Sequence, residues 1–175
     1  DMEILTYVLD GEIAHKDSMG NGSTIHPGEV QRMTAGTGVT HSEFNHARDA
    51  TTRFLQIWVV PERRGLTPGY EQRRFDDERR GRLRLVVSPD GRDGSLRVHQ
   101  ELAMYASLLA PGESVTHDVA AGKRVWIQVV RGRLRVGDEQ LDAGDGAATP
   151  TPSDGADALT ITAEDDSELL LFELP

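Results

Sequence analysis

The feature that most constrains the fold of this chain is an internal repeat. Residues 124–136 (RVWIQVVRGRLRV) align with residues 3–15 (EILTYVLDGEIAH) without a gap, and the alignment places Gly132 on Gly11. Each copy has the form of a strand, a glycine turn and a second strand. Solenoid repeats recur every ~20–50 residues, whereas these two copies lie much further apart. The repeat therefore predicts two tandem copies of a small barrel.

Short runs rich in β-branched and aromatic residues recur along the chain, and turn signals separate them. The first run ends at Asp10-Gly11, a dipeptide typical of a tight hairpin. Pro27-Gly28-Glu29 marks another turn, and Ala143-Gly144-Asp145 stands at the corresponding place in the second half. No helical periodicity lies between the runs, so we expect an all-β protein. The expected strands include residues 4–9, 12–15, 30–33, 54–60, 83–87 and 168–174.

The length of 175 residues allows one large domain or two small ones, and the repeat favours two. We expect an N-terminal barrel with its connector in residues 1–94 and a C-terminal barrel in residues 95–175. Residues 61–94 form the connector, because they are rich in Pro, Gly and charges of alternating sign. We expect the arginines of this connector at a solvated surface, because acidic residues alternate with them.

The composition limits the chemistry that this chain can perform. Its 19 basic and 29 acidic residues give a net charge of −10, which disfavours nucleic acid and anionic membranes as partners. The chain has no cysteine, so imidazole and carboxylate groups must hold any metal. No apolar run approaches the ~20 residues that span a bilayer, and the first residues lack the pattern of a signal peptide. We therefore expect a cytoplasmic protein.

Residues 36–45 (GTGVTHSEFN) form the densest cluster of potentially functional side chains. Side chains alternate along an extended segment, so His41 and Glu43 point to one face and Ser42 to the other. An imidazole nitrogen and a carboxylate oxygen suit a divalent metal such as Fe, Mn, Ni, Cu or Zn, although two ligands alone do not hold one. An ordinary surface pair on a strand is the alternative interpretation, and it stays open at this point.

The other histidines of the first half give weaker signals. His15 and His26 lie on short strands around a turn, where we expect them to be exposed or hydrogen-bonded in a structural role. His46 follows His41 by five residues in a polar segment, and it would point away from the pair if the strand continued.

Three segments of the first half resemble the signature of the pirin family, within the cupin superfamily. They are residues 1–11 (DMEILTYVLDG), 17–21 (DSMGN) and 27–43 (PGEVQRMTAGTGVTHSE). The resemblance continues through Gln100, Tyr105, residues 124–130 and residues 144–146, so it covers nearly the whole chain. Bacterial pirin-like proteins are the relatives that it suggests.

The resemblance implies a bicupin, that is, two tandem cupin barrels of the double-stranded β-helix or jelly-roll type. It also implies that the N-terminal barrel binds one divalent metal through three histidines and a glutamate, with His41 as the third histidine and Glu43 as the carboxylate. The first two histidines belong to a His-x-His pair expected immediately before Asp1, so the N-terminal barrel is incomplete here and the metal can be absent. The C-terminal barrel is expected to be metal-free, because Asp118 and Ala120 stand where such a pair would lie.

The resemblance implies the activity of a quercetin 2,3-dioxygenase, which opens a flavonol ring with O2 and releases carbon monoxide. Iron is the first expectation for the metal, with copper, nickel, manganese, zinc and cobalt as alternatives. Glu43 would be the catalytic base that accepts the 3-hydroxyl proton. Met33 and Phe44 are candidates for the pocket wall, although core packing is the ordinary role of such residues. The alternatives are a pirin-type co-regulator that contacts protein partners and a truncated scaffold without activity, and a monomer is expected.

Overall fold

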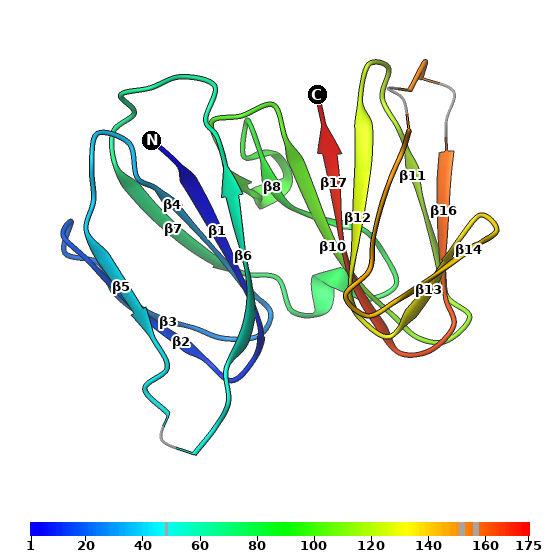
Figure 1. Cartoon of the computed structure of the whole chain (residues 1–175), viewed down its shortest axis with the longest axis horizontal. Coiled ribbons are helices and arrows are strands. Elements are labelled where there is room, and N and C mark those ends of the chain that lie inside the picture. Colours follow the sequence, from blue (N-terminus) through cyan, green and yellow to red (C-terminus); the bar gives the residue numbers. More distant parts are fainter. Residues whose placement is uncertain (48, 151–152, 156–157) are drawn as a thin grey trace. The chain divides into compact units, whose positions relative to one another are not determined.

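A computed structural model describes residues 1–47, 49–150, 153–155 and 158–175, and the described part of the chain consists of strands, turns and two short 3-10 helices (Figure 1). The expected all-β class is confirmed. The strands are β1 (Glu3–Asp10), β2 (Ile13–Asp17), β3 (Gly22–Ile25), β4 (Glu29–Thr34), β5 (His41–Phe44), β6 (Arg53–Val59), β7 (Gly69–Arg74), β8 (Arg84–Ser88), β9 (Leu96–Arg97), β10 (Ala103–Leu109), β11 (Ser114–Asp118), β12 (Arg124–Arg131), β13 (Arg133–Val136), β14 (Glu139–Asp142), β15 (Gly146–Ala148), β16 (Ala158–Ala163) and β17 (Ser167–Leu174), and the 3-10 helices are η1 (Asp77–Arg79) and η2 (Arg92–Gly94). Within the described residues, no helix is long and apolar enough to cross a membrane.

The chain divides into two compact units, and each unit is formed by two separate stretches of the sequence. Residues 1–76 and 89–100 form the first unit, and residues 77–88 and 101–175 form the second. The expected boundary after residue 94 differs from this division, because β8 pairs with β10 in the second unit while the imidazole of His99 hydrogen-bonds Glu3 in the first.

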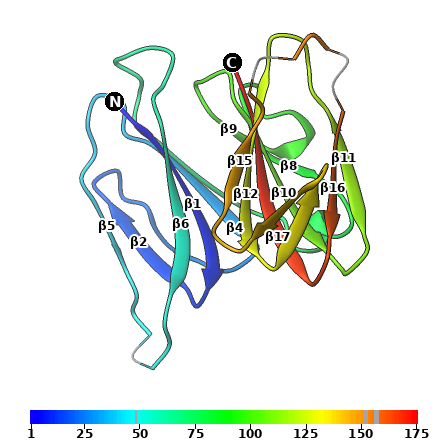
Figure 2. The same ribbon diagram turned by 45° about the vertical axis from the view of Figure 1, so that its right-hand side comes forward.

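The first unit contains two antiparallel sheets. One has the strand order β6-β1-β4-β7 and the other has the order β3-β2-β5. Val8 of β1, Ile13 of β2 and Ile25 of β3 form one buried cluster, so the two sheets pack face to face. β5 and β6 are edge strands of their sheets, and both can be located in Figure 2.

The second unit has the same plan. Of the strands in this unit, β15-β12-β17-β10-β8 are neighbours in that order in one sheet, and β11-β16-β13-β14 form the other. Side chains from both sheets form its core, including Val115, Ile127, Leu134, Ile161 and Leu171. The pairing of β12 with β17 and of β17 with β10 can be followed in Figure 2.

The internal repeat is visible in the backbone. β1 and β12 each have eight residues and each is followed by a glycine with positive φ, Gly11 at 67° and Gly132 at 74°. A Cβ on Gly11 would lie 2.7 Å from the carbonyl oxygen of Thr51, and one on Gly132 would lie 2.4 Å from that of Asp166. Both positions therefore require glycine, because a side chain would be strained and would overlap the neighbouring backbone.

The connector differs from the expectation in two respects. Residues 69–74 form β7, which pairs with β4 along its whole length, although their polar sequence gave no strand signal. Arg63, Arg64 and Arg80 are exposed as expected, but Arg79 is 6% exposed. Its guanidinium contacts Glu168 Oε1 at 2.9 Å, and this ion pair is what allows an arginine to be buried there.

Candidate functional site

His41 and Glu43 lie on β5, which pairs with β2 so that Glu43 is opposite His15. Both side chains are beside His15: the rings of His41 and His15 stack with their centroids 5.8 Å apart, and Glu43 Oε1 lies 3.7 Å from His15 Nδ1. The structure therefore brings the two predicted site residues together on the inner face of the smaller sheet. Sequence reasoning did not place His15 among them.

The larger sheet presents a row of polar side chains to this pair. Thr6 of β1 is in register with Gln56 of β6 on one side and with Gln31 of β4 on the other, and Gln31 is in register with Gln72 of β7. We call these four residues the polar row. Each contacts the smaller sheet through a hydrogen bond. Thr6 and Gln31 are buried, and their hydrogen bonds offset the cost of removing these polar groups from water.

The polar row holds the carboxylate of Glu43 from two strands. Gln56 Nε2 donates a hydrogen bond to Oε2 at 2.8 Å, and the hydroxyl of Thr6 approaches Oε1 at 3.5 Å. The side chain of Glu43 is 12% exposed. One carboxylate oxygen is thus well bonded, while the other faces the hydroxyl and the imidazole of His15 at longer distances.

His15 is buried and is held from both ring nitrogens. Nε2 lies 3.2 Å from Asp17 Oδ2, and Nδ1 lies 3.1 Å from Gln31 Nε2. Burial raises the pKa of Asp17, but hydrogen bonds from Asn21, His15 and Met19 outweigh that effect and lower it to about 2. The ionised carboxylate of Asp17 accepts a hydrogen bond from Nε2–H of His15, so Nδ1 accepts the hydrogen bond from Gln31 Nε2.

Tyr70 closes the inner end of the cluster. Its ring stacks on His15 with the centroids 4.8 Å apart, and its hydroxyl donates to Gln72 Oε1 at 2.8 Å. Burial raises the pKa of Tyr70, and the nearby carboxylates of Asp17 and Glu43 raise it further, against a hydrogen bond with Ser23. The Tyr70 hydroxyl therefore keeps its proton and serves as a hydrogen-bond donor in this cluster.

The other residues singled out by the sequence make no contact with the Glu43 carboxylate among the interactions described above. Met33 is buried on the inner face of the larger sheet, whereas Phe44 follows Glu43 on the strand and therefore points to the opposite face, 43% exposed. His46 Nε2 contacts Glu12 Oε1 at 2.8 Å, and His26 Nδ1 contacts the other oxygen of that carboxylate at 3.5 Å. These two histidines thus pair with Glu12.

The donor types of His41 and Glu43 fit a divalent transition metal, but their number does not complete a site. Protein metal sites ordinarily have three or four protein ligands. Across the described ranges, the structure contains no group of three or more histidine, cysteine, aspartate or glutamate side chains that could hold a metal ion. The chain contributes two ligands at most from this strand.

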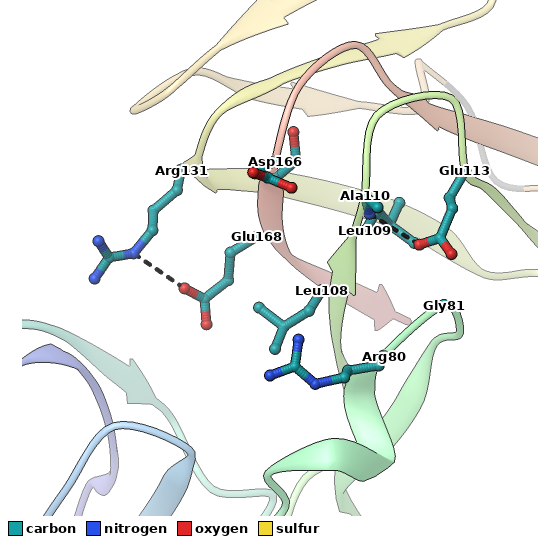
Figure 3. Close-up of a pocket in the computed structure, with 10 residues that line it drawn as sticks. Arg80, Gly81, Leu108, Leu109, Ala110, Glu113, Arg131, Asp166 and Glu168 are labelled. Carbon is teal, nitrogen blue, oxygen red and sulfur yellow. Dashed lines mark hydrogen bonds and ion pairs between the residues drawn. The ribbon is translucent and has the colours of Figure 1, made fainter.

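A cavity of about 570 Å³ lies in the second unit (Figure 3). Arg80, Leu108, Glu113, Arg131 and Glu168 are among the residues that line it. Arg131 Nε donates to Glu168 Oε2 at 3.3 Å, the ion pair marked in Figure 3. The lining mixes both signs of charge.

Comparisons with known proteins place the chain in a family. A model described as "Pirin" matches residues 1–59, and one described as "Quercetinase C-terminal cupin domain" matches residues 85–174. The chain is 49% identical over 175 residues to quercetin 2,3-dioxygenase of Escherichia coli K12. The matched region is 100% of this chain and 73% of that protein. The chain is 38% identical over 177 residues to the putative quercetin 2,3-dioxygenase Rv0181c of Mycobacterium tuberculosis H37Rv, covering 99% of this chain and 70% of that protein.

Solved structures agree with this placement. The bacterial pirin YhhW from Escherichia coli, solved in complex with nickel(II), matches with a TM-score of 0.91 and 47% identity, covering 100% of this chain and 73% of that one. YhaK from Escherichia coli matches with a TM-score of 0.82 and 29% identity, covering 99% and 75% of the two chains. The expected bicupin fold is confirmed, and the chain belongs to the pirin family.

Proposed function

We propose that the protein containing this chain is a metal-dependent dioxygenase of the quercetin 2,3-dioxygenase type. Its substrates would be a flavonol and O2, and its products an opened ring and carbon monoxide. The observation that carries the proposal is that His41 and Glu43 lie together beside His15, with the carboxylate of Glu43 held by Gln56 and Thr6 of the facing sheet. The 49% identity to a quercetin 2,3-dioxygenase from Escherichia coli supports the same reaction class.

In this proposal His41 and Glu43 are two ligands of a single divalent metal. The pirin resemblance assigns the other two ligands to a His-x-His pair that precedes Asp1. When bound, the metal supplies Lewis acidity toward the flavonol oxygens. Iron is our first expectation, and the nickel(II) in the YhhW structure supports nickel among the alternatives, which also include copper, manganese, zinc and cobalt.

Glu43 is the proposed base for the 3-hydroxyl proton of the flavonol. Gln56 holds Oε2 at 2.8 Å, whereas Oε1, among the described residues, has the longer contacts with Thr6 at 3.5 Å and His15 at 3.7 Å. Oε1 is therefore the oxygen with capacity to accept a proton. A base must be held within hydrogen-bonding reach of the proton that it removes, and the bond from Gln56 keeps the carboxylate in one orientation.

The test uses the full-length protein loaded in turn with each of the candidate metals. Quercetin should lose its near-ultraviolet band under O2, with release of carbon monoxide. Glu43→Gln should lower the rate by roughly 100-fold or more, in line with the contribution of general bases. Glu62→Gln, at an exposed position of the same unit, is the matched control and should retain the wild-type rate. No turnover with any metal, or full activity of Glu43→Gln, would contradict the proposal.

A further inference from the structure

Strand β6 carries two exposed aromatic residues on the face that points toward Glu43 of the other sheet. Phe54, Gln56 and Trp58 point to the same side because side chains alternate along a strand. Gln56 contacts Glu43, so that side is the one facing the candidate site. Phe54 is 40% exposed and Trp58 is 62% exposed. A large open aromatic surface therefore borders the carboxylate.

A chain of two hydrogen bonds connects Trp58 to Glu43. The indole Nε1 donates to Gln56 Oε1 at 3.1 Å, and Gln56 Nε2 donates to Glu43 Oε2 at 2.8 Å. The Gln56 amide uses its acceptor on one side and a donor on the other, so both neighbours fix its orientation. The position of the exposed indole is thus coupled to that of the carboxylate.

The strand register extends the aromatic surface into the core. Trp58 is in register with Ile4, Ile4 with Met33, and Met33 with Tyr70. We call these four residues the apolar row. Ile4 and Met33 are buried while Trp58 at the sheet edge is open, so the row runs from the core to a solvent-facing indole.

The two rows together define the chemistry of a ligand. They lie two residues apart on each strand, which corresponds to a separation of about 7 Å. A flat aromatic ring suits the exposed indole of Trp58 at the open end of the apolar row, and hydroxyl groups on the same ring system would lie beside Gln56 and Glu43. A planar polyphenol has both features, since its ring faces are apolar and its edge carries hydroxyls.

We propose that Trp58 binds the ring of a flavonol by stacking on its exposed indole, and that Gln56 is a positioning residue that couples this stacking to the orientation of Glu43. The inference rests on the proposed function and adds the residue that holds the substrate ring. Neither contact passes through a metal. The protein should therefore bind the flavonol in the absence of metal, and binding can be separated from turnover.

The experiment measures quercetin binding to the full-length protein in chelator without O2, by isothermal titration calorimetry. Trp58→Ala should weaken binding roughly tenfold, since the stacking contact and the apolar area that it buries are both lost. Trp58→Phe should recover most of the affinity. Trp126→Phe is the matched control, because Trp126 lies in the second unit on β12, and it should bind as the wild type does.

A second measurement keeps the test independent of any folding defect in Trp58→Ala. In a Trp126→Phe background, Trp58 is the only tryptophan among residues 1–175, and quercetin at saturation should quench emission that is missing from a Trp58→Phe/Trp126→Phe double variant. Gln56→Leu in this background should shift the emission of the free protein to the red, because the indole loses its anchor, and should weaken binding.

The outcomes separate the two proposals. Wild-type affinity in Trp58→Ala, equal weakening in Trp126→Phe, or no binding by the metal-free wild type would each overturn the role of Trp58. The dioxygenase proposal would then be tested by the bleaching assay alone. If binding depends on Trp58 but no metal supports turnover, the ligand site stands and the reaction is wrong.

Discussion

Gly132 offers the sharpest test of the repeated fold. Alanine there must keep a positive φ, which costs roughly 1–2 kcal/mol for a residue with a Cβ. Its Cβ would also lie 2.4 Å from both the carbonyl oxygen of Asp166 and the hydroxyl of Ser167. Relief of such an overlap costs about a further 1–3 kcal/mol. We expect Gly132→Ala to lower the free energy of unfolding by about 2–5 kcal/mol in total.

Gly137 is the matched control for this substitution. It lies in the same unit with φ of 60°, and a Cβ there would have no heavy atom within 4 Å beyond its chain neighbours. Gly137→Ala should therefore lose only the conformational part, about 1–2 kcal/mol. The difference between the two variants isolates the steric contribution of the turn at Gly132.

Urea unfolding followed by Trp126 emission measures both variants. Trp126 lies in the second unit, and a Trp58→Phe background makes it the only tryptophan among residues 1–175. A midpoint shift at constant slope reports the stability change. If Gly132→Ala loses no more stability than Gly137→Ala, the close approach at this turn does not restrict the residue and the reasoning from the repeat is wrong.

Two further predictions follow from buried charges. The pKa of Asp17 in the folded protein, about 2, lies below the ordinary value of 3.8, so its carboxylate stabilises the fold above pH 4 and this contribution is lost as the pH falls toward 2. Asp17→Asn should remove that part of the acid dependence in a pH series of thermal unfolding. Glu168→Ala should lower the free energy of unfolding in urea by about 3–5 kcal/mol, because it removes this partner of the buried Arg79 cation. Asp77→Ala should lower it by less than about 1 kcal/mol, because the pair of Asp77 with Arg80 is exposed. Equal losses in these two variants would contradict the burial argument.

The strands with strong local signals could be predicted from the sequence. The run at residues 4–9 corresponds to β1, and that at residues 54–60 corresponds to β6, each within one residue at either end. β7 could not be predicted in this way, because its residues (GYEQRR) have no apolar alternation. Its pairing with β4 at a sheet edge, a contact between distant segments, makes it a strand.

Only the part of the candidate site that depends on local sequence could be predicted in the same way. Alternation along one strand is a local property, and it placed His41 and Glu43 on a common face. The contacts of Glu43 with Gln56 and Thr6 arise from packing between two sheets, which no local pattern describes. Local patterns likewise predict only a structural role for His15, because its place opposite Glu43 arises from strand pairing.

The repeat itself nevertheless contains a signal for two of these residues. Three inner positions of the repeat are apolar in both copies: Ile4 and Val125, Val8 and Val129, Ile13 and Leu134.

At two other inner positions, the first copy has Thr6 and His15 where the second has Ile127 and Val136. Ile127 is buried in the core of the second unit and Val136 packs against it, so the fold accepts apolar side chains at both positions. A buried hydroxyl and imidazole each need hydrogen-bond partners and stabilise a core less than the aliphatic residues do. The first copy retains them at a cost that the fold does not require. Their retention is best explained by the carboxylate that they both face, Glu43.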